Sequence, residues 1–422
     1  MSPAPRKRRG RSARPQPIAR RGRRATGLAL AGGGPEGAVY EIGALRALDE
    51  AVDGLDLNAL SVYVGVSAGA FLAANLANGL TSAQMCRAIV KHEPGEHPFV
   101  PETFFTPAVG EWARRGLSVP RLALEALWAF ARNPRDRSLL DSLTRLSRAL
   151  PVGIFDNRPI REYLRAIYSI KGRTDDFREL DRRLYVVAAE LESGKSVIFG
   201  SPGFDHVPIS RAVQASSALP GLYPPVEIDG RNYVDGILNH TMHAAVALEA
   251  GARLVICVNP LVPVDASSRS YEPAHGSEDL IDRGLPTVLS QTFRTLIHSR
   301  LTMGMQSNAR LFRDADVLLL EPDRDDHRMF FTNIFSFSAR RAVAAHAYER
   351  TRRDLLARYE DLAPVLERHG LTLNRATLEE RRDLWEGVEI DGNPPPRPAP
   401  GSEETLERLA ESLDRLEALL RN

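Results

Sequence analysis

Two short glycine-containing motifs near the start of the sequence have the residue types and spacing for acyl transfer at a serine. The second of these motifs along the chain is GVSAG, over residues 65–69. It follows the apolar run 62–64 and opens an alanine-rich, helix-like stretch. On a sharp turn from strand to helix, a G-x-S-x-G sequence lifts the serine hydroxyl clear of the sheet, and its glycines allow close approach of the backbone. Ser67 is therefore the candidate nucleophile, and Gly65 and Gly69 are expected to form the tight turn around it.

The other motif, GGGPEG over residues 32–37, follows the apolar run 28–31 and precedes a helix-like stretch over 38–51. Attack of a serine on an ester needs hydrogen-bond donors where the carbonyl oxygen becomes negative. A triple glycine at the end of a strand leaves backbone N–H groups unhindered, next to the positive end of a helix. The sequence therefore predicts an oxyanion hole, with Gly33, Gly34 and Ala68 as donors and with Gly32 and Gly37 in the same glycine loop.

The sequence offers one main candidate for the base that accepts the serine proton. Residues 233–235 predict a short strand that ends at Asp235, and Gly236 forms the turn after it. Aspartate side chains at such turns often only brace the backbone. Asp235 is thus a candidate base, with the bracing role left open as the alternative.

These motifs need a sheet to position them, and the sequence predicts one. Amphipathic helical stretches lie between most of the apolar runs rich in β-branched residues, which cover 27–31, 60–64, 184–190, 253–258 and 316–320. This alternation is typical of a mostly parallel sheet covered on both faces. Residues 185–189 and 196–199 are separated by a glycine turn, which predicts an antiparallel hairpin at the sheet.

The two ends of the chain differ in composition from its middle. Residues 1–24 hold many arginines and almost no apolar residue, which predicts a disordered basic arm. A solvated tail and peripheral contact with an anionic membrane both fit this arm, and no nucleic-acid partner is expected. A proline-rich linker over 393–401 precedes a leucine-striped amphipathic helix over 402–422, for which docking on its own domain and self-association both remain open.

Overall composition excludes several classes of protein. The 422 residues carry a net charge of +1, and no run of about 18 apolar residues occurs. The absence of an apolar segment behind the first arginines argues against a signal peptide, so we expect a cytoplasmic protein, peripheral to membrane at most. Cys86 and Cys257 have no cysteine or histidine at ligand spacing, which predicts two buried thiols.

The order of glycine loop, G-x-S-x-G and Asp-Gly resembles the patatin-like phospholipase family, over roughly residues 26–260. The segment 211–220 is also similar to the one that precedes the family's aspartate strand. The resemblance implies a three-layer α/β/α fold with a mostly parallel central sheet, a helical insertion and C-terminal helices. It further implies a lipid acyl hydrolase, of phospholipase A or lysophospholipase type, in which Ser67 is the nucleophile, Asp235 is its base, and no histidine, metal or other cofactor takes part.

On this resemblance the catalytic domain is expected to span residues 25–350, with a helical insertion at about 80–150, and a helical extension is expected over 351–392. The insertion could cap the site or merely pack as ordinary helices. Two positions depart from the family pattern. Glu36 stands where a lysine or arginine is usual, and Ile237 where alanine or glycine follows the Asp-Gly pair.

Three alternatives compete with this interpretation. The glycine loop also fits the dinucleotide pattern G-x-G-x-x-G, but the second strand leads into GVS and not into the acidic residue that would bind a ribose. A catalytically degenerate lipid-binding scaffold would tolerate Glu36. A conventional α/β-hydrolase would add a histidine to the serine and the acid, and the candidates for that base are His240, His243, His298, His327 and His346.

Overall fold

The computed structural model describes residues 25–91, 104–110, 112, 151–239, 242–265, 280–282, 284–324, 326, 337–386 and 388. The predicted basic arm, proline-rich linker and C-terminal leucine-striped helix lie outside these residues, as does most of the predicted insertion. In the part of the chain that is described, no helix is long and apolar enough to cross a membrane.

The centre of the molecule is an eight-stranded sheet with the order β6-β7-β4-β3-β1-β8-β9, in which β5 also pairs with β4. The strands β4, β3, β1, β8 and β9 run parallel, while β5, β6 and β7 join antiparallel. Their bounds are β1 (Thr26–Leu30), β3 (Val62–Val66), β4 (Arg183–Glu190), β5 (Ser196–Phe199), β6 (Val226–Ile228), β7 (Arg231–Asp235), β8 (Leu254–Val258) and β9 (Asp316–Leu320).

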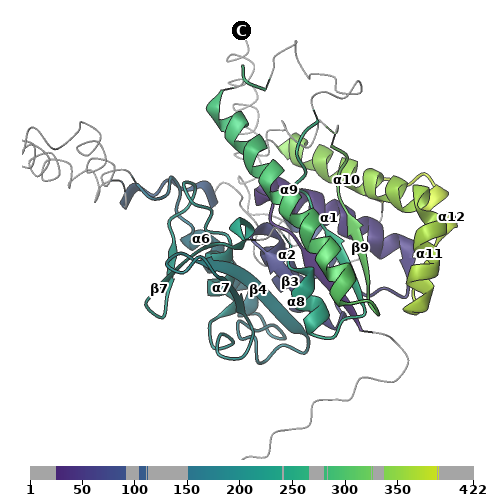
Figure 1. Cartoon of the computed structure of the whole chain (residues 1–422), viewed down its shortest axis with the longest axis horizontal. Coiled ribbons are helices and arrows are strands. Elements are labelled where there is room, and N and C mark those ends of the chain that lie inside the picture. The colour runs from purple at the N-terminus through teal and green to yellow at the C-terminus, as the bar shows by residue number, and fades with distance from the viewer. Residues whose placement is uncertain are drawn as a thin grey trace, which may run out of the picture.

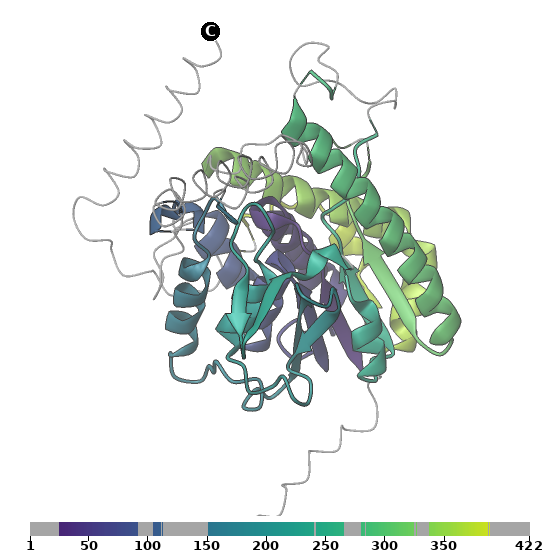
Figure 2. The same ribbon diagram turned by 60° about the vertical axis from the view of Figure 1, so that its left-hand side comes forward.

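Helices cover both faces of this sheet. Side chains alternate between the faces along each strand: Leu28 and Leu30 of β1 pack into one apolar cluster, while Ala29 and Ala31 pack into the other. The first cluster is completed by α1 (Gly34–Ala51), α2 (Ala68–Ala77), α6 (Arg158–Tyr168), α7 (Ile209–Ser216) and α10 (Phe337–Ala357). The second is completed by α8 (Ala244–Glu249) and α9 (Leu285–Leu311). In Figure 1, α9 passes in front of α1, and Figure 2 shows the layers turned by 60°.

The predicted fold class is confirmed, as are all five predicted strands and the glycine-turn hairpin, which is the antiparallel pair β4–β5. Both cysteines are buried and free, as expected. Smaller elements are α3 (Ser82–Met85), the π-helix Cys86–Val90, α11 (Tyr359–Arg368), α12 (Arg375–Glu379), and the antiparallel pair of β2 (Val52–Asp53) and β10 (Thr372–Leu373). Helix α10 continues through residue 350 and packs along α1 as part of the core.

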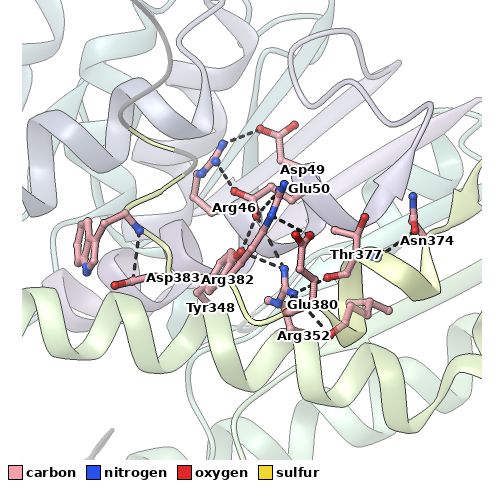
Figure 3. A network of polar contacts seen from close by, with 12 residues as sticks. Arg46, Asp49, Glu50, Tyr348, Arg352, Asn374, Thr377, Glu380, Arg382 and Asp383 are labelled. Carbon is pink, nitrogen blue, oxygen red and sulfur yellow. Dashed lines mark hydrogen bonds and ion pairs between the residues drawn. The ribbon is translucent and has the colours of Figure 1, made fainter.

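A buried polar network fixes α10 and the segment after it on α1 (Figure 3). Glu50 near the end of α1 accepts hydrogen bonds from Arg46 and from the hydroxyl of Tyr348 on α10. Arg352, one turn further along α10, donates to Tyr348 and to the carbonyl oxygens of Thr377 and Glu380. The network therefore holds α1, the helix that starts at the glycine loop, from its far end.

We expect the substitution Arg352→Met to lower the free energy of unfolding by about 3–5 kcal/mol, because it leaves buried polar partners without their cation. Arg352 is 5 % exposed. The neighbouring Arg353 is exposed, so Arg353→Met is the matched control and should change the free energy of unfolding by less than about 0.5 kcal/mol. Urea unfolding of the two variants measures both values, and equal destabilisation would show that the network does not hold the extension.

Candidate active site

Ser67 lies between β3 and α2 in a backbone conformation that is unusual for any residue except glycine. Its φ is 54° and its ψ is −122°, a strained geometry that places a nucleophile on a sharp turn. The two flanking glycines have no room for a side chain: a Cβ on Gly65 would lie 2.4 Å from the Cα of Ala70, and one on Gly69 would lie 2.5 Å from the carbonyl oxygen of Ala31. The chain therefore makes a tight turn at Ser67 that requires glycine at positions 65 and 69.

The side chain of Ser216 links this turn to strand β4. The backbone N–H of Ser67 donates to the hydroxyl oxygen of Ser216 over 2.8 Å, and that hydroxyl donates to the carbonyl oxygen of Val187 on β4 over 2.6 Å. Ser216 is completely buried. The sequence did not single it out, because a serine at the end of a helix carries no mark of a contact with a residue 149 positions away.

The sheet register brings Asp235 to Ser67. Val66 at the end of β3 pairs with Val187 of β4, and Asp235 at the end of β7 pairs with the next residue, Ala188. Strand β5 occupies the other edge of β4 at both of these positions, so β3 and β7 share one edge and run toward each other. The residue that follows β3 and the last residue of β7 therefore meet, and the Ser67 hydroxyl lies close enough to the Asp235 carboxylate to lower its pKa.

The Asp235 carboxylate does two things at once. One oxygen accepts the N–H of Ile237 over 3.0 Å and braces the turn, as such side chains often do. The Ser67 hydroxyl lies beside the same carboxylate. Burial raises the pKa of Asp235 to about 7, against the lowering effect of the Ile237 N–H and the Ser67 hydroxyl. Gly236 is required next to it, because a Cβ there would lie 2.4 Å from the carbonyl oxygen of Val187.

The N-termini of α1 and α2 lie at the same cavity as Ser67 and Asp235. Gly33 caps α1, Gly34 begins it, and Ala68 begins α2. The N–H groups at these positions have no carbonyl one turn earlier in their helices, and all three residues line one cavity together with Ser67 and Asp235.

The remaining two glycines of the predicted loop do not line this cavity. The N–H of Gly37 already donates to the carbonyl oxygen of Gly33 over 3.0 Å. Gly32 packs against Ser67, where a Cβ on Gly32 would lie 3.1 Å from the Cβ of Ser67. Gly32 and Gly37 therefore serve the close packing of the loop, and we leave them out of the set of donors.

The cavity has a volume of about 730 Å³ and a mostly apolar wall. This size falls in the range of sites for small organic ligands. The lining includes aromatic and aliphatic side chains from several elements, among them Phe71, Phe104, Phe105, Ile160, Leu222 and Tyr223. An apolar chain fits such a wall, because burial removes it from water.

Two arginines that the sequence did not connect with the site also line the cavity: Arg294 of α9 and Arg340 of α10. Arg294 lies near Glu36, the acid at the position where a basic residue is usual. Burial raises the pKa of Glu36 to about 7, and the charge of Arg294 opposes this rise. Position 36 thus lacks the basic side chain, but α9 brings a guanidinium to the glycine loop from elsewhere in the sequence.

No histidine within the described residues lines the cavity. Of the five histidines named as alternative bases, His346 is hydrogen bonded to Asp326. His243 and His298 are not among the residues that line the cavity. His240 and His327 lie outside the described residues.

Comparison with solved structures gives similarities of low sequence identity. VipD from Legionella pneumophila is 15% identical with a TM-score of 0.33, over 82% of this chain and 80% of that one. Full-length ExoU from the type III secretion system of Pseudomonas aeruginosa, in complex with SpcU, is 15% identical with a TM-score of 0.28, over 67% and 52%. Human GIVD cytosolic phospholipase A2 is 14% identical with a TM-score of 0.23, over 56% and 40%. The chain thus spans about half or less of the length of the last two proteins.

The model of one family, described as patatin-like phospholipase, matches residues 28–248, a range that contains both motifs and Asp235 and is more than half of the chain. Members of this family hydrolyse acyl esters of lipids. The chain therefore belongs to the patatin-like phospholipase family and is an ester-hydrolysing enzyme that acts on lipids.

Proposed function

We propose that the chain cleaves fatty-acyl esters of phospholipids or lysophospholipids through a dyad of Ser67 and Asp235. The observation that carries this proposal is that the sheet register brings the Ser67 and Asp235 side chains together at one cavity, which Gly33, Gly34 and Ala68 also line. The absence of a histidine from the lining, within the described residues, favours a dyad over a triad.

The proposed reaction follows from this arrangement. The acyl chain lies in the apolar cavity, and the ester carbonyl oxygen points at the helix N-termini. Ser67 attacks the carbonyl carbon while its proton passes to Asp235, and the backbone N–H groups stabilise the resulting oxyanion. Asp235 then gives the proton to the departing alcohol, which leaves an acyl-serine. A water molecule attacks this ester in the same way, and the fatty acid departs.

Asp235 suits both halves of this cycle because it must accept and release one proton. A group is most effective as a general base and acid when its pKa lies near the working pH. The pKa of about 7 that burial imposes on Asp235 meets this condition, whereas an exposed aspartate would be a much weaker base.

This pKa gives a testable pH dependence. We expect kcat/KM for a soluble, non-ionising ester to rise with pH up to about 7 and to level off above it, because Asp235 must be ionised to accept the serine proton. A pH–rate profile between pH 5 and 9 measures this directly. A profile that is flat across that range would show that no group with the pKa of Asp235 controls the reaction.

The proposed activity is tested with vesicles of mixed lipid composition, from which released fatty acids are identified by mass spectrometry. Phosphatidylcholine, lysophosphatidylcholine and triacylglycerol in the same vesicles compete for the enzyme. We expect fatty acids from the first two lipids with the wild-type chain and none with Ser67→Ala. Release from triacylglycerol alone would contradict the proposed substrate class, and equal release by the variant would contradict the site.

A further inference from the structure

Helix α9 exposes a row of large apolar side chains to solvent. They are Leu285, Val288, Leu289, Phe293, Leu296, Met303 and Leu311, each between 40% and 72% exposed. At about 100° per residue, these seven positions fall within an arc of about 140° around the helix. The other side of α9 packs on the core through Ile297, Leu301 and Met305. Figure 1 shows α9 crossing the front of the molecule. An exposed apolar strip of this length marks a surface that binds something.

The strip continues into the mouth of the active-site cavity. Leu289 and Phe293 are exposed and also line the cavity. The same holds for Ile154, Leu219 and Leu238, which come from three other segments of the chain. Large apolar side chains thus surround the opening, and α9 extends this apolar rim outward.

The charges on α9 all have one sign. The helix contains Arg294, Arg300 and Arg310 and no aspartate or glutamate among its 27 residues. Arg300 and Arg310 are exposed and lie on the same side as the apolar strip. Arg300 also donates to the carbonyl oxygen of Leu238 over 2.6 Å and so fastens α9 to the rim. Arginines among exposed apolar residues complement a surface of anionic headgroups above acyl chains.

We infer that the outer face of α9 and the apolar rim form one interfacial binding surface, which seats the cavity mouth on an anionic lipid bilayer. The inference rests on the proposed lipid hydrolysis for its choice of partner. A lipid that enters through a mouth seated in this way passes from the bilayer to the cavity along apolar side chains. Its acyl chain then avoids transfer through water, which is unfavourable for apolar surface.

The test replaces two residues of the strip that do not line the cavity, in the double variant Leu296→Asp/Met303→Asp. Both side chains are more than half exposed, so the fold does not depend on them. Leu191, the residue that follows β4, is 52% exposed, and Leu191→Asp is the matched control. All three full-length proteins are compared by co-sedimentation with vesicles of phosphatidylcholine and phosphatidylserine in a 4:1 ratio. Hydrolysis of vesicle lipid and of a short-chain soluble ester is measured in parallel.

We expect the double variant to bind these vesicles at least about tenfold more weakly than the wild type, because buried apolar area and attraction to anionic lipid set interfacial affinity. Hydrolysis of vesicle lipid should fall with binding, while hydrolysis of the soluble ester stays unchanged. Leu191→Asp should behave as the wild type. Omission of phosphatidylserine should weaken wild-type binding.

Three outcomes would overturn the inference. The double variant could bind vesicles as tightly as the wild type, or Leu191→Asp could lose binding equally. Size-exclusion chromatography could instead show a wild-type dimer that the double variant dissolves with vesicle binding intact, which would assign the strip to a second copy of the chain. Failure of the wild-type chain to hydrolyse the soluble ester would have a different meaning. It would contradict the proposed function and leave the measured dependence of vesicle binding on α9 in place.

Discussion

Replacement of Asp235 by asparagine should reduce kcat/KM for ester hydrolysis by about four orders of magnitude, the scale of effect seen when a catalytic carboxylate is replaced by its amide. Asparagine keeps the shape of the side chain and can still accept the N–H of Ile237, the bond that braces the turn. It cannot accept a proton from Ser67. The loss should therefore appear with a soluble ester as well as with vesicle lipid.

The folded state of this variant can be checked independently. The pKa of Asp235 is raised by burial to about 7, from an ordinary value of 3.8. The folded protein thus holds this proton more tightly than the unfolded chain, and its stability falls as pH rises from about 4 to about 7. Asparagine has no charge to bury, so the melting temperature of Asp235→Asn at pH 8 should be no lower than that of the wild type.

Histidine substitutions separate the dyad from a triad. We expect the glutamine variants of the five candidates to retain most of the activity on a soluble ester, since none is needed for proton transfer; they are those at His240, His243, His298, His327 and His346. A folded histidine variant without activity, or an active Asp235→Asn enzyme, would return the chain to the triad alternative.

Removal of the nucleophile should have the second large effect. Ser67→Ala should lower kcat/KM by several orders of magnitude, to a level set by binding and the oxyanion hole alone. Because Ser67 and Asp235 act in one proton transfer, their effects should not add. The double variant Ser67→Ala/Asp235→Asn should be about as inactive as either single variant. Additive losses would show that the two side chains contribute to separate steps.

The sequence indicates which residues are candidates for the site, but it does not indicate that Ser67 and Asp235 lie next to each other. GVSAG and the Asp-Gly pair are local patterns, and each requires a particular turn that the structure contains. Their encounter depends on β3 and β7 sharing one edge of β4 at Val187 and Ala188. Such a register joins segments more than 160 residues apart in the sequence, and no local pattern encodes it.

The elements of the fold also differ in how clearly the sequence marks them. Runs of β-branched residues marked the five main strands, because a strand buried on both faces has no polar positions. Helix α9 was not recognised as a distinct element. Threonines, serines and arginines interrupt its apolar residues, so its outer face lacks the contrast of an ordinary surface helix. The guanidinium of Arg294 near Glu36 was missed for the same reason, since its position follows only from the packing of α9.

The most direct measurement of the central claim is covalent labelling with an alkyl fluorophosphonate, followed by mass spectrometry of the peptides. The wild-type chain should gain one phosphonyl group, and fragmentation should place it on Ser67. Ser67→Ala should remain unlabelled, and Asp235→Asn should react far more slowly, because the serine proton has no acceptor. Labelling on another residue, or equal rates of labelling in the wild type and in Asp235→Asn, would contradict the Ser67–Asp235 dyad.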